Sequence, residues 1–218
     1  MKTFLIAITG NTGSGKSTLT KKILEHYAKH TVSLIEDHYC FDRSHIHPLE
    51  DRLNHNFDQP SAIDYDYLIQ NITQLQNGNN INAPIYFYQT ASRSQQTEMI
   101  MAKPIIIIEG LFVLLNEALC KLCDLKIYLD VDIESCIKRR LERDVIDRGM
   151  PQWFTPSQLD YIRNGEQYVL KSKSQADLII QNNDRNIASC IQPIKDKLDH
   201  FLNYTDHQPN GGYNYASI

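Results

Sequence analysis

The chain has 218 residues, of which 42% are hydrophobic and 22% are charged, and its formal net charge is -4. This balance is typical of a soluble globular protein, and the length suits one domain with a sizeable core. Mild acidity excludes a bulk basic field, which argues against a nucleic-acid-binding protein. No apolar run approaches the length needed to cross a bilayer, so we expect no membrane association.

The first 80 residues alternate predicted strands and helices. Apolar runs predict strands over 4–9 and 32–35, and helical spacing of apolar residues predicts helices over 19–27 and 68–75. The polar stretch 37–60 between them is too long for a simple connection. It is therefore a candidate functional loop.

A predicted hairpin interrupts the alternation of strands and helices, which then continues through the rest of the chain. Residues 81–101 alternate and are rich in Tyr, Thr and Ile, which predicts a β-hairpin. Strands are expected over 105–108, 125–129 and 178–180, with helices over 133–148 and near 157–174. Continuous apolar strands separated by helices predict a parallel sheet covered on both faces. We expect a single domain over residues 1–203 and a flexible C-terminal tail over 204–218.

A glycine-rich turn joins the first strand to the first helix. Gly10-x4-Gly15-Lys16-Ser17 satisfies the whole phosphate-loop pattern in its strand–turn–helix context. Backbone N–H groups and the helix N-terminus would hold the phosphates, Lys16 would reach the terminal ones, and Ser17 would give its hydroxyl to Mg²⁺. Together with the alternating strands and helices and the hairpin expected over 81–101, this turn predicts an α/β fold of the phosphate-loop NTPase type, with a parallel sheet, helices on both faces and an appended hairpin. The candidate nucleotide-binding residues are Gly10, Asn11, Thr12, Gly13, Ser14, Gly15, Lys16, Ser17 and Thr18.

Residues outside the phosphate loop indicate the acceptor of the phosphate. The Asn-Lys-x-Asp and Asp-x-x-Gly motifs of GTPases and the Leu-Ser-Gly-Gly signature of transporter ATPases do not occur. Asp37 follows the second strand, and ligands of parallel sheets collect at the carboxyl ends of strands. A carboxylate there can accept a proton from an attacking hydroxyl. A helix N-cap and a Mg²⁺-shell aspartate are the alternatives for Asp37.

Several motifs together resemble the uridine kinase (uridine–cytidine kinase) family. They are "GNTGSGKST", "EDHY", "NFDQPSAID", "PIYFY", "IIIIEG", "RRLERDVIDRG" and "ADLII", and they lie between residue 4 and about residue 186. The resemblance implies transfer of the γ-phosphoryl group of ATP, or GTP, with Mg²⁺ to the 5′-hydroxyl of uridine or cytidine, as in pyrimidine salvage. The resemblance also implies a homo-oligomer, specifically a tetramer. Separately, the odd number of five cysteines favours reduced thiols in a cytoplasm.

The resemblance also assigns roles to single residues. Asp37 matches the catalytic base, Asp58 the carboxylate that holds the ribose hydroxyls, and Glu109 the acid that helps place Mg²⁺ through water. Substrate contacts are expected from Tyr86 and Tyr88 of the hairpin. Three arginines match those that close over the phosphates in the family: Arg140, Arg143 and Arg148. Arg140 is also expected near the substrate.

The departures from the family lie mostly on the nucleoside side. Ala91 stands where the family has a histidine that contacts the pyrimidine, Met150 where arginine is usual, and Gln59 where histidine is usual. The sequence therefore leaves open whether the protein prefers uridine or cytidine. Two other functions also remain: a related kinase for another riboside or small hydroxyl acceptor, and a nucleotide-dependent assembly factor that hydrolyses ATP slowly.

Overall fold

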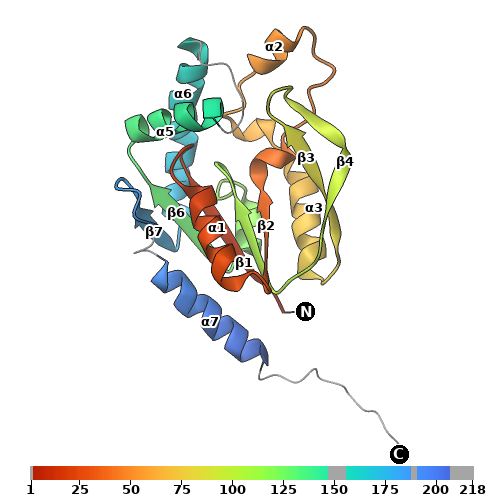
Figure 1. Ribbon diagram of the computed structural model, residues 1–218, viewed down its shortest axis with the longest axis vertical. Coiled ribbons are helices and arrows are strands. Elements are labelled where there is room, and N and C mark those ends of the chain that lie inside the picture. Colours follow the sequence, from red (N-terminus) through yellow and green to blue (C-terminus); the bar gives the residue numbers. More distant parts are fainter. Residues whose placement is uncertain (1, 147–155, 188–190, 207–218) are drawn as a thin grey trace, which may run out of the picture.

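A computed structural model describes residues 2–146, 156–187 and 191–206 (Figure 1). The strands are β1 (Phe4–Gly10), β2 (Thr31–Ile35), β3 (Ile81–Phe87), β4 (Ser92–Ile100), β5 (Ile105–Glu109), β6 (Leu125–Asp130) and β7 (Leu178–Gln181). The α-helices are α1 (Lys16–Tyr27), α2 (Leu49–Leu53), α3 (Tyr65–Gln76), α4 (Glu117–Leu122), α5 (Ile133–Ile146), α6 (Pro156–Ser172) and α7 (Gln192–Asp206). Short 3₁₀ turns are η1 (Glu36–Tyr39), η2 (Pro60–Ala62) and η3 (Lys173–Gln175).

Five parallel strands form the main sheet in the order β2-β5-β1-β6-β7. Leu5 of β1 pairs with Ile106 of β5, and Ile6 of β1 pairs with Leu125 of β6. The isoleucines of β5 are fully buried, as expected for a central strand covered on both faces. The predicted parallel sheet is confirmed. Because β2, β5 and β1 are neighbours, their carboxyl ends lie together at the same edge of the sheet.

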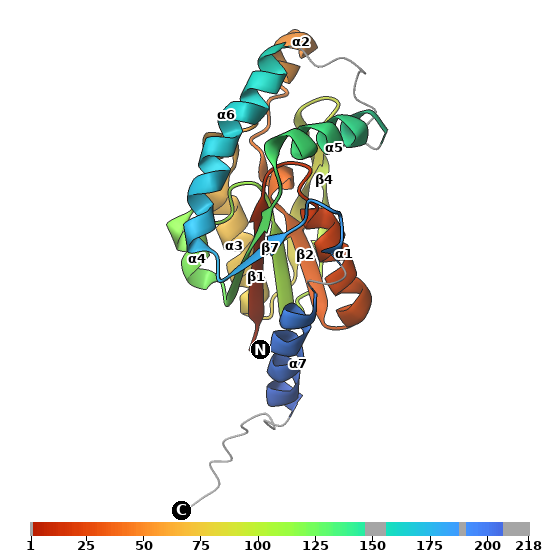
Figure 2. The same cartoon turned by 90° about the vertical axis from the view of Figure 1, so that its left-hand side faces the viewer.

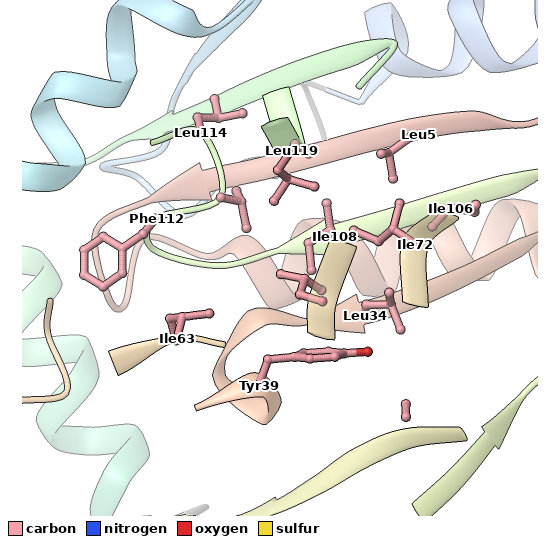
Figure 3. Close-up of a cluster of buried hydrophobic side chains, with 14 of the residues drawn as sticks. Leu5, Leu34, Tyr39, Ile63, Ile72, Ile106, Ile108, Phe112, Leu114 and Leu119 are labelled. Carbon is pink, nitrogen blue, oxygen red and sulfur yellow. The ribbon is translucent and has the colours of Figure 1, made fainter. Parts of the chain in front are cut away.

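Each face of the sheet has its own hydrophobic core, because successive side chains of a strand point to opposite faces. Leu5 and Ala7 belong to the core that α3, α4 and α6 cover, part of which is drawn in Figure 3. Ile6 and Ile8 belong to the core that α1 and α7 cover. Figure 2 shows α1 and α3 on opposite sides of the sheet.

The hairpin of β3 and β4 is antiparallel, as predicted, and lies beside η1. Arg93 of β4 fixes it there. Its guanidinium donates hydrogen bonds to the backbone oxygens of Tyr39 and Cys40, each at 2.8 Å, and forms an ion pair with Asp64 at the start of α3. The hairpin is thereby held over the end of β2.

The C-terminal helix α7 was not predicted. Ile194, Leu198 and Phe201 recur at helical spacing and are buried against the sheet. The helix continues to Asp206, so the expectation of a loose tail is wrong for residues 204–206. Residues 207–218 lie outside the described part of the chain.

The helix expected over 133–148 is described as far as Ile146. Among the described helices, none is long and apolar enough to cross a membrane. The described cysteines are free thiols.

Candidate active site

The phosphate loop has the geometry that its sequence predicts. Gly15 adopts a left-handed conformation, with φ of 102°, directly before α1 begins at Lys16. The ammonium of Lys16 donates hydrogen bonds to the backbone oxygens of Gly10 at 2.9 Å and Asn11 at 3.0 Å. Burial lowers the pKa of Lys16, although Glu109 and Asp37 oppose this effect. The ammonium is thus held across the loop.

Segments from the second half of the chain support the loop from outside. A Cβ atom on Gly13, whose φ is 74°, would lie 2.5 Å from the backbone oxygen of Cys136 in α5. The amide of Asn182, after β7, donates to the backbone oxygen of Ser14 at 2.7 Å. Arg139 of α5 in turn donates to the backbone oxygen of Asn182 at 3.2 Å. Sequence reasoning missed Asn182, because nothing near it in the chain indicates this contact.

Glu109 ends β5 next to the phosphate loop. Its neighbours in the sheet are Ile8 of β1 and Ile35 of β2. Burial raises the pKa of Glu109, while Lys16 and a hydrogen bond with Ser17 lower it. The Oε2 atom is buried and has no hydrogen-bond partner among the described residues. A buried carboxylate oxygen of this kind beside a serine hydroxyl fits the oxygen ligands that Mg²⁺ prefers.

Two cavities meet at Asp37. The first, the phosphate-loop cleft, is bordered by Lys16, Ser17, Glu109 and Arg139. The second, the apolar pocket, is bordered by residues of η1, the hairpin, α5 and α6. The residues that border both are Thr12, Asp37, Tyr88, Leu111 and Arg143. A group bound in the apolar pocket would therefore approach the phosphates at Asp37.

The apolar pocket is bordered by all of the predicted substrate residues. Asp58, Tyr86, Tyr88 and Arg140 all border it, and Ala91 is buried at its edge. The hydroxyl of Tyr86 is buried without a hydrogen-bond partner among the described residues. Because an unpaired buried hydroxyl is costly, this atom is suited to a polar group of a bound ligand. The pocket thus combines apolar walls with a few polar groups.

The arginines of α5 are joined by a carboxylate that sequence reasoning missed. Arg140 donates to Asp58 at 2.7 Å and to Asp144 at 3.3 Å. Arg143 donates to Asp144 through two nitrogens, at 2.9 and 2.7 Å. Asp144 follows Arg140 by four residues, which is the one signal that indicates the contact. Arg148 and Met150 lie outside the described residues.

Two comparisons of the sequence with known proteins agree on one family. The sequence model described as "Phosphoribulokinase / Uridine kinase family" matches residues 5–189. A protein named uridine kinase from Staphylococcus epidermidis is 39% identical over 188 residues, which cover 85% of this chain and 90% of that one. A protein of the same name from Bacillus anthracis is 35% identical over 211 residues, covering 93% of this chain and 98% of that one.

Solved structures show the same fold at low identity. Phosphoribulokinase from Rhodobacter spheroides is 18% identical with a TM-score of 0.61, and covers 83% of this chain and 70% of that one. At this identity the likeness concerns the fold alone. It supports the predicted architecture, a parallel sheet behind a phosphate loop.

Proposed function

Because the chain belongs to the phosphoribulokinase/uridine kinase family, we propose that it transfers the γ-phosphoryl group of ATP to the 5′-hydroxyl of uridine or cytidine. One observation carries the proposal: the phosphate-loop cleft and the apolar pocket meet at Asp37. A donor in the cleft and an acceptor in the pocket would present their reacting ends to the same carboxylate. Transfer in line between them needs little more than positioning and charge neutralisation.

Asp37 is the proposed base. It accepts the proton of the 5′-hydroxyl while that oxygen forms a bond to the γ-phosphorus and the bond from this phosphorus to the β–γ bridging oxygen breaks. ADP leaves with the bridging oxygen. The position of Asp37 at the end of β2, bordering both cavities, supports this role over that of a helix cap.

Positive groups on both sides of the transfer would stabilise its charge. Lys16 serves the terminal phosphates from the phosphate loop, and Arg143 borders both cavities from α5. Preorganised cations in a site shielded from water contribute more than they would in bulk solvent. Arg148 keeps its expected role in ATP binding as a prediction.

Ser17 and Glu109 are the residues that would hold Mg²⁺, the hydroxyl directly and the carboxylate through water. When bound, the ion supplies charge neutralisation at the phosphate oxygens. The unpartnered Oε2 atom of Glu109 among the described residues supports this assignment. We propose ATP as the donor, with GTP as the alternative.

Asp58 is proposed to hold the vicinal hydroxyls of the ribose. A single ionised carboxylate can accept a hydrogen bond from each hydroxyl, and such bonds are stronger than neutral ones. Its position in the pocket, with an exposed fraction of 7%, supports the role. Tyr86 and Tyr88 complete the walls of the nucleoside site. Such an acceptor fits pyrimidine salvage.

An acceptor screen tests the proposal. Purified protein with ATP and Mg²⁺ is offered uridine, cytidine, other ribosides and small hydroxyl compounds, and ADP is measured against phosphorylated acceptor. We expect one ADP for each nucleotide formed, with uridine or cytidine among the best acceptors. The Lys16→Ala variant should fold and show almost no transfer, because it lacks the charge at the terminal phosphates.

Two results of the screen would contradict the proposal. Good transfer to a non-pyrimidine acceptor alone would favour a related kinase of the same family. Slow ATP hydrolysis that no acceptor stimulates would favour a nucleotide-dependent assembly factor. The homo-oligomer, a tetramer, and the cytoplasmic location expected from the resemblance are proposed as well, and light scattering of the purified protein measures the former.

A further inference from the structure

Glu36 is a buried acid at the end of β2 that the proposed mechanism does not use. It precedes Asp37, borders the apolar pocket and has an exposed fraction of 0%. Acidic side chains are rarely buried to this extent without a cationic partner. No ion pair of Glu36 occurs among the described residues. The hydrogen bonds around its carboxyl group therefore need an explanation.

These hydrogen bonds can form a closed ring of three residues. The backbone N–H of Phe112 donates to Oε2 of Glu36 at 2.9 Å. The hydroxyl of Tyr65 lies 3.0 Å from Oε1 of Glu36 and 3.3 Å from the backbone oxygen of Phe112. That oxygen also accepts from Leu115, and a carbonyl oxygen has room for two hydrogen bonds.

The direction of the bonds depends on the proton of Glu36. If the carboxyl is neutral, Oε1–H donates to Tyr65, Tyr65 donates to the backbone oxygen of Phe112, and the N–H of Phe112 donates to Oε2. All three contacts are then used in one direction. If the carboxyl is ionised, Tyr65 donates its single hydroxyl proton to Oε1 of Glu36. Tyr65 then cannot donate a hydrogen bond to the backbone oxygen of Phe112.

We propose that Glu36 is held as a neutral carboxylic acid by this ring, and that it is a positioning residue which leaves Asp37 as the one anion at the end of β2. The ring also ties Phe112 and its neighbour Leu111, which border the apolar pocket, to the residue before the base. The space for the carboxyl group exists because residue 110 is glycine: a Cβ atom on Gly110 would collide with Glu36.

The charges around Glu36 agree with a neutral form. Burial, with a smaller contribution from the neighbouring Asp37, raises the pKa of Glu36 to about 8, against the hydrogen bonds from Phe112 and Tyr65 and the charge of Lys16. The groups that face it from the packed elements are Asp37 of η1, Cys40 after η1, Tyr65 of α3 and Lys16 of α1. Lys16 is the one cation of this set, and its own ammonium is directed to the phosphate loop.

A neutral Glu36 makes the stability of the folded chain depend on pH. In the unfolded chain Glu36 ionises near its ordinary pKa, whereas in the folded chain it keeps its proton until about pH 8. Stability is therefore highest below the unfolded pKa and falls as the pH rises towards the folded pKa. Glutamine has the same shape, donates to Tyr65 and accepts from Phe112, but does not ionise.

Thermal unfolding of Glu36→Gln tests the proposal without any assay of catalysis. We expect its Tm to match that of the wild type near pH 5 and to exceed it by several degrees at pH 8, with the difference growing between these values. Glu98→Gln, the same change on the exposed face of β4, is the control and should show no such growth. The proposal is overturned if the Glu36→Gln protein fails to fold. It is also overturned if the Tm of the variant minus the Tm of the wild type is smaller at pH 8 than at pH 5.

The second readout rests on the proposed kinase function. Ionisation of Glu36 above about pH 8 opens the ring and puts a second negative charge beside the base. The kcat of the wild type should therefore fall on the alkaline side, and Glu36→Gln should move this fall to higher pH. If kcat falls at the same alkaline pH in both proteins, Glu36 is not a positioning residue for Asp37. Absence of any kinase activity, with the expected Tm pattern intact, would count against the proposed function alone.

Discussion

Arg140 of α5 and Asp58 of the polar stretch 37–60 form an ion pair in the apolar pocket, with Nη1 of Arg140 2.7 Å from Oδ1 of Asp58. Their positions differ by 82 residues in the sequence. The pair joins an arginine expected to act on the phosphates to the carboxylate expected to hold the ribose. A nucleoside that binds Asp58 must therefore share this carboxylate with Arg140, which links acceptor binding to the position of α5.

Arg140→Ala tests this link. Removal of the guanidinium leaves Asp58 without its cation and takes one positive charge from the transfer site. We expect kcat/KM for uridine to fall by roughly 10²-fold, the size typical of one lost transition-state donor, with KM for uridine raised. Steady-state kinetics measures both. Lys138→Ala, an exposed position two residues earlier on α5, should behave as the wild type, and equal losses in both variants would exclude a specific role for Arg140.

Asp37→Asn separates a base from a binding residue. The amide keeps the size of the carboxylate and loses the proton acceptor, so kcat should fall roughly 10²- to 10⁴-fold while the KM values change little. Asp51→Asn, on the exposed side of α2, is the matched control. A raised KM at unchanged kcat would reduce Asp37 to a binding role.

Asp58→Ala tests ribose recognition. A site built to bind a hydroxyl penalises its absence, because its own polar group is then left unpaired. The wild type should prefer uridine to 2′-deoxyuridine, and the variant should lose most of this preference together with affinity for uridine. Competition between the two nucleosides gives the ratio of kcat/KM directly. Equal turnover by the wild type would remove the basis for the role.

Much of this site could be predicted because its signals are local. The glycines of the phosphate loop, the apolar run of β5 and the alternating residues of the hairpin each lie within one short segment, and all three predictions of local structure are confirmed. The strand order could not be predicted in the same way, because it depends on pairings between segments far apart in the chain.

The residues that were missed are held by contacts between distant segments. Asn182 reaches the phosphate loop from 168 residues away, and Glu36 reaches Phe112 from 76 residues away. Asp144 lies in a helix rich in charges, where its four-residue spacing from Arg140 is the one local signal of the contact. Helix α7 was overlooked because its apolar residues are sparse among polar ones, although Ile194 and Leu198 are fully buried.

Ala91→His tests how the base is recognised. Ala91 has a φ of 45°, a conformation in which histidine is more common than most residues, so the change should be tolerated by the backbone. An imidazole can donate at one nitrogen and accept at the other, which serves both uracil and cytosine. We expect the wild type to have an uneven uridine-to-cytidine ratio of kcat/KM, and the variant to move it towards parity. No change in the ratio would show that another residue or a water reads the base edge.

The position of the new phosphate group tests transfer to the 5′-hydroxyl. The wild type is incubated with ATP, Mg²⁺ and either uridine or 5′-deoxyuridine, and products are followed by ³¹P NMR. We expect uridine to give a single 5′-monophosphate with one ADP for each, and 5′-deoxyuridine to give no phosphorylated product. Phosphate on a secondary hydroxyl, or ADP formed at the same rate with both nucleosides, would contradict transfer to the 5′-hydroxyl at Asp37.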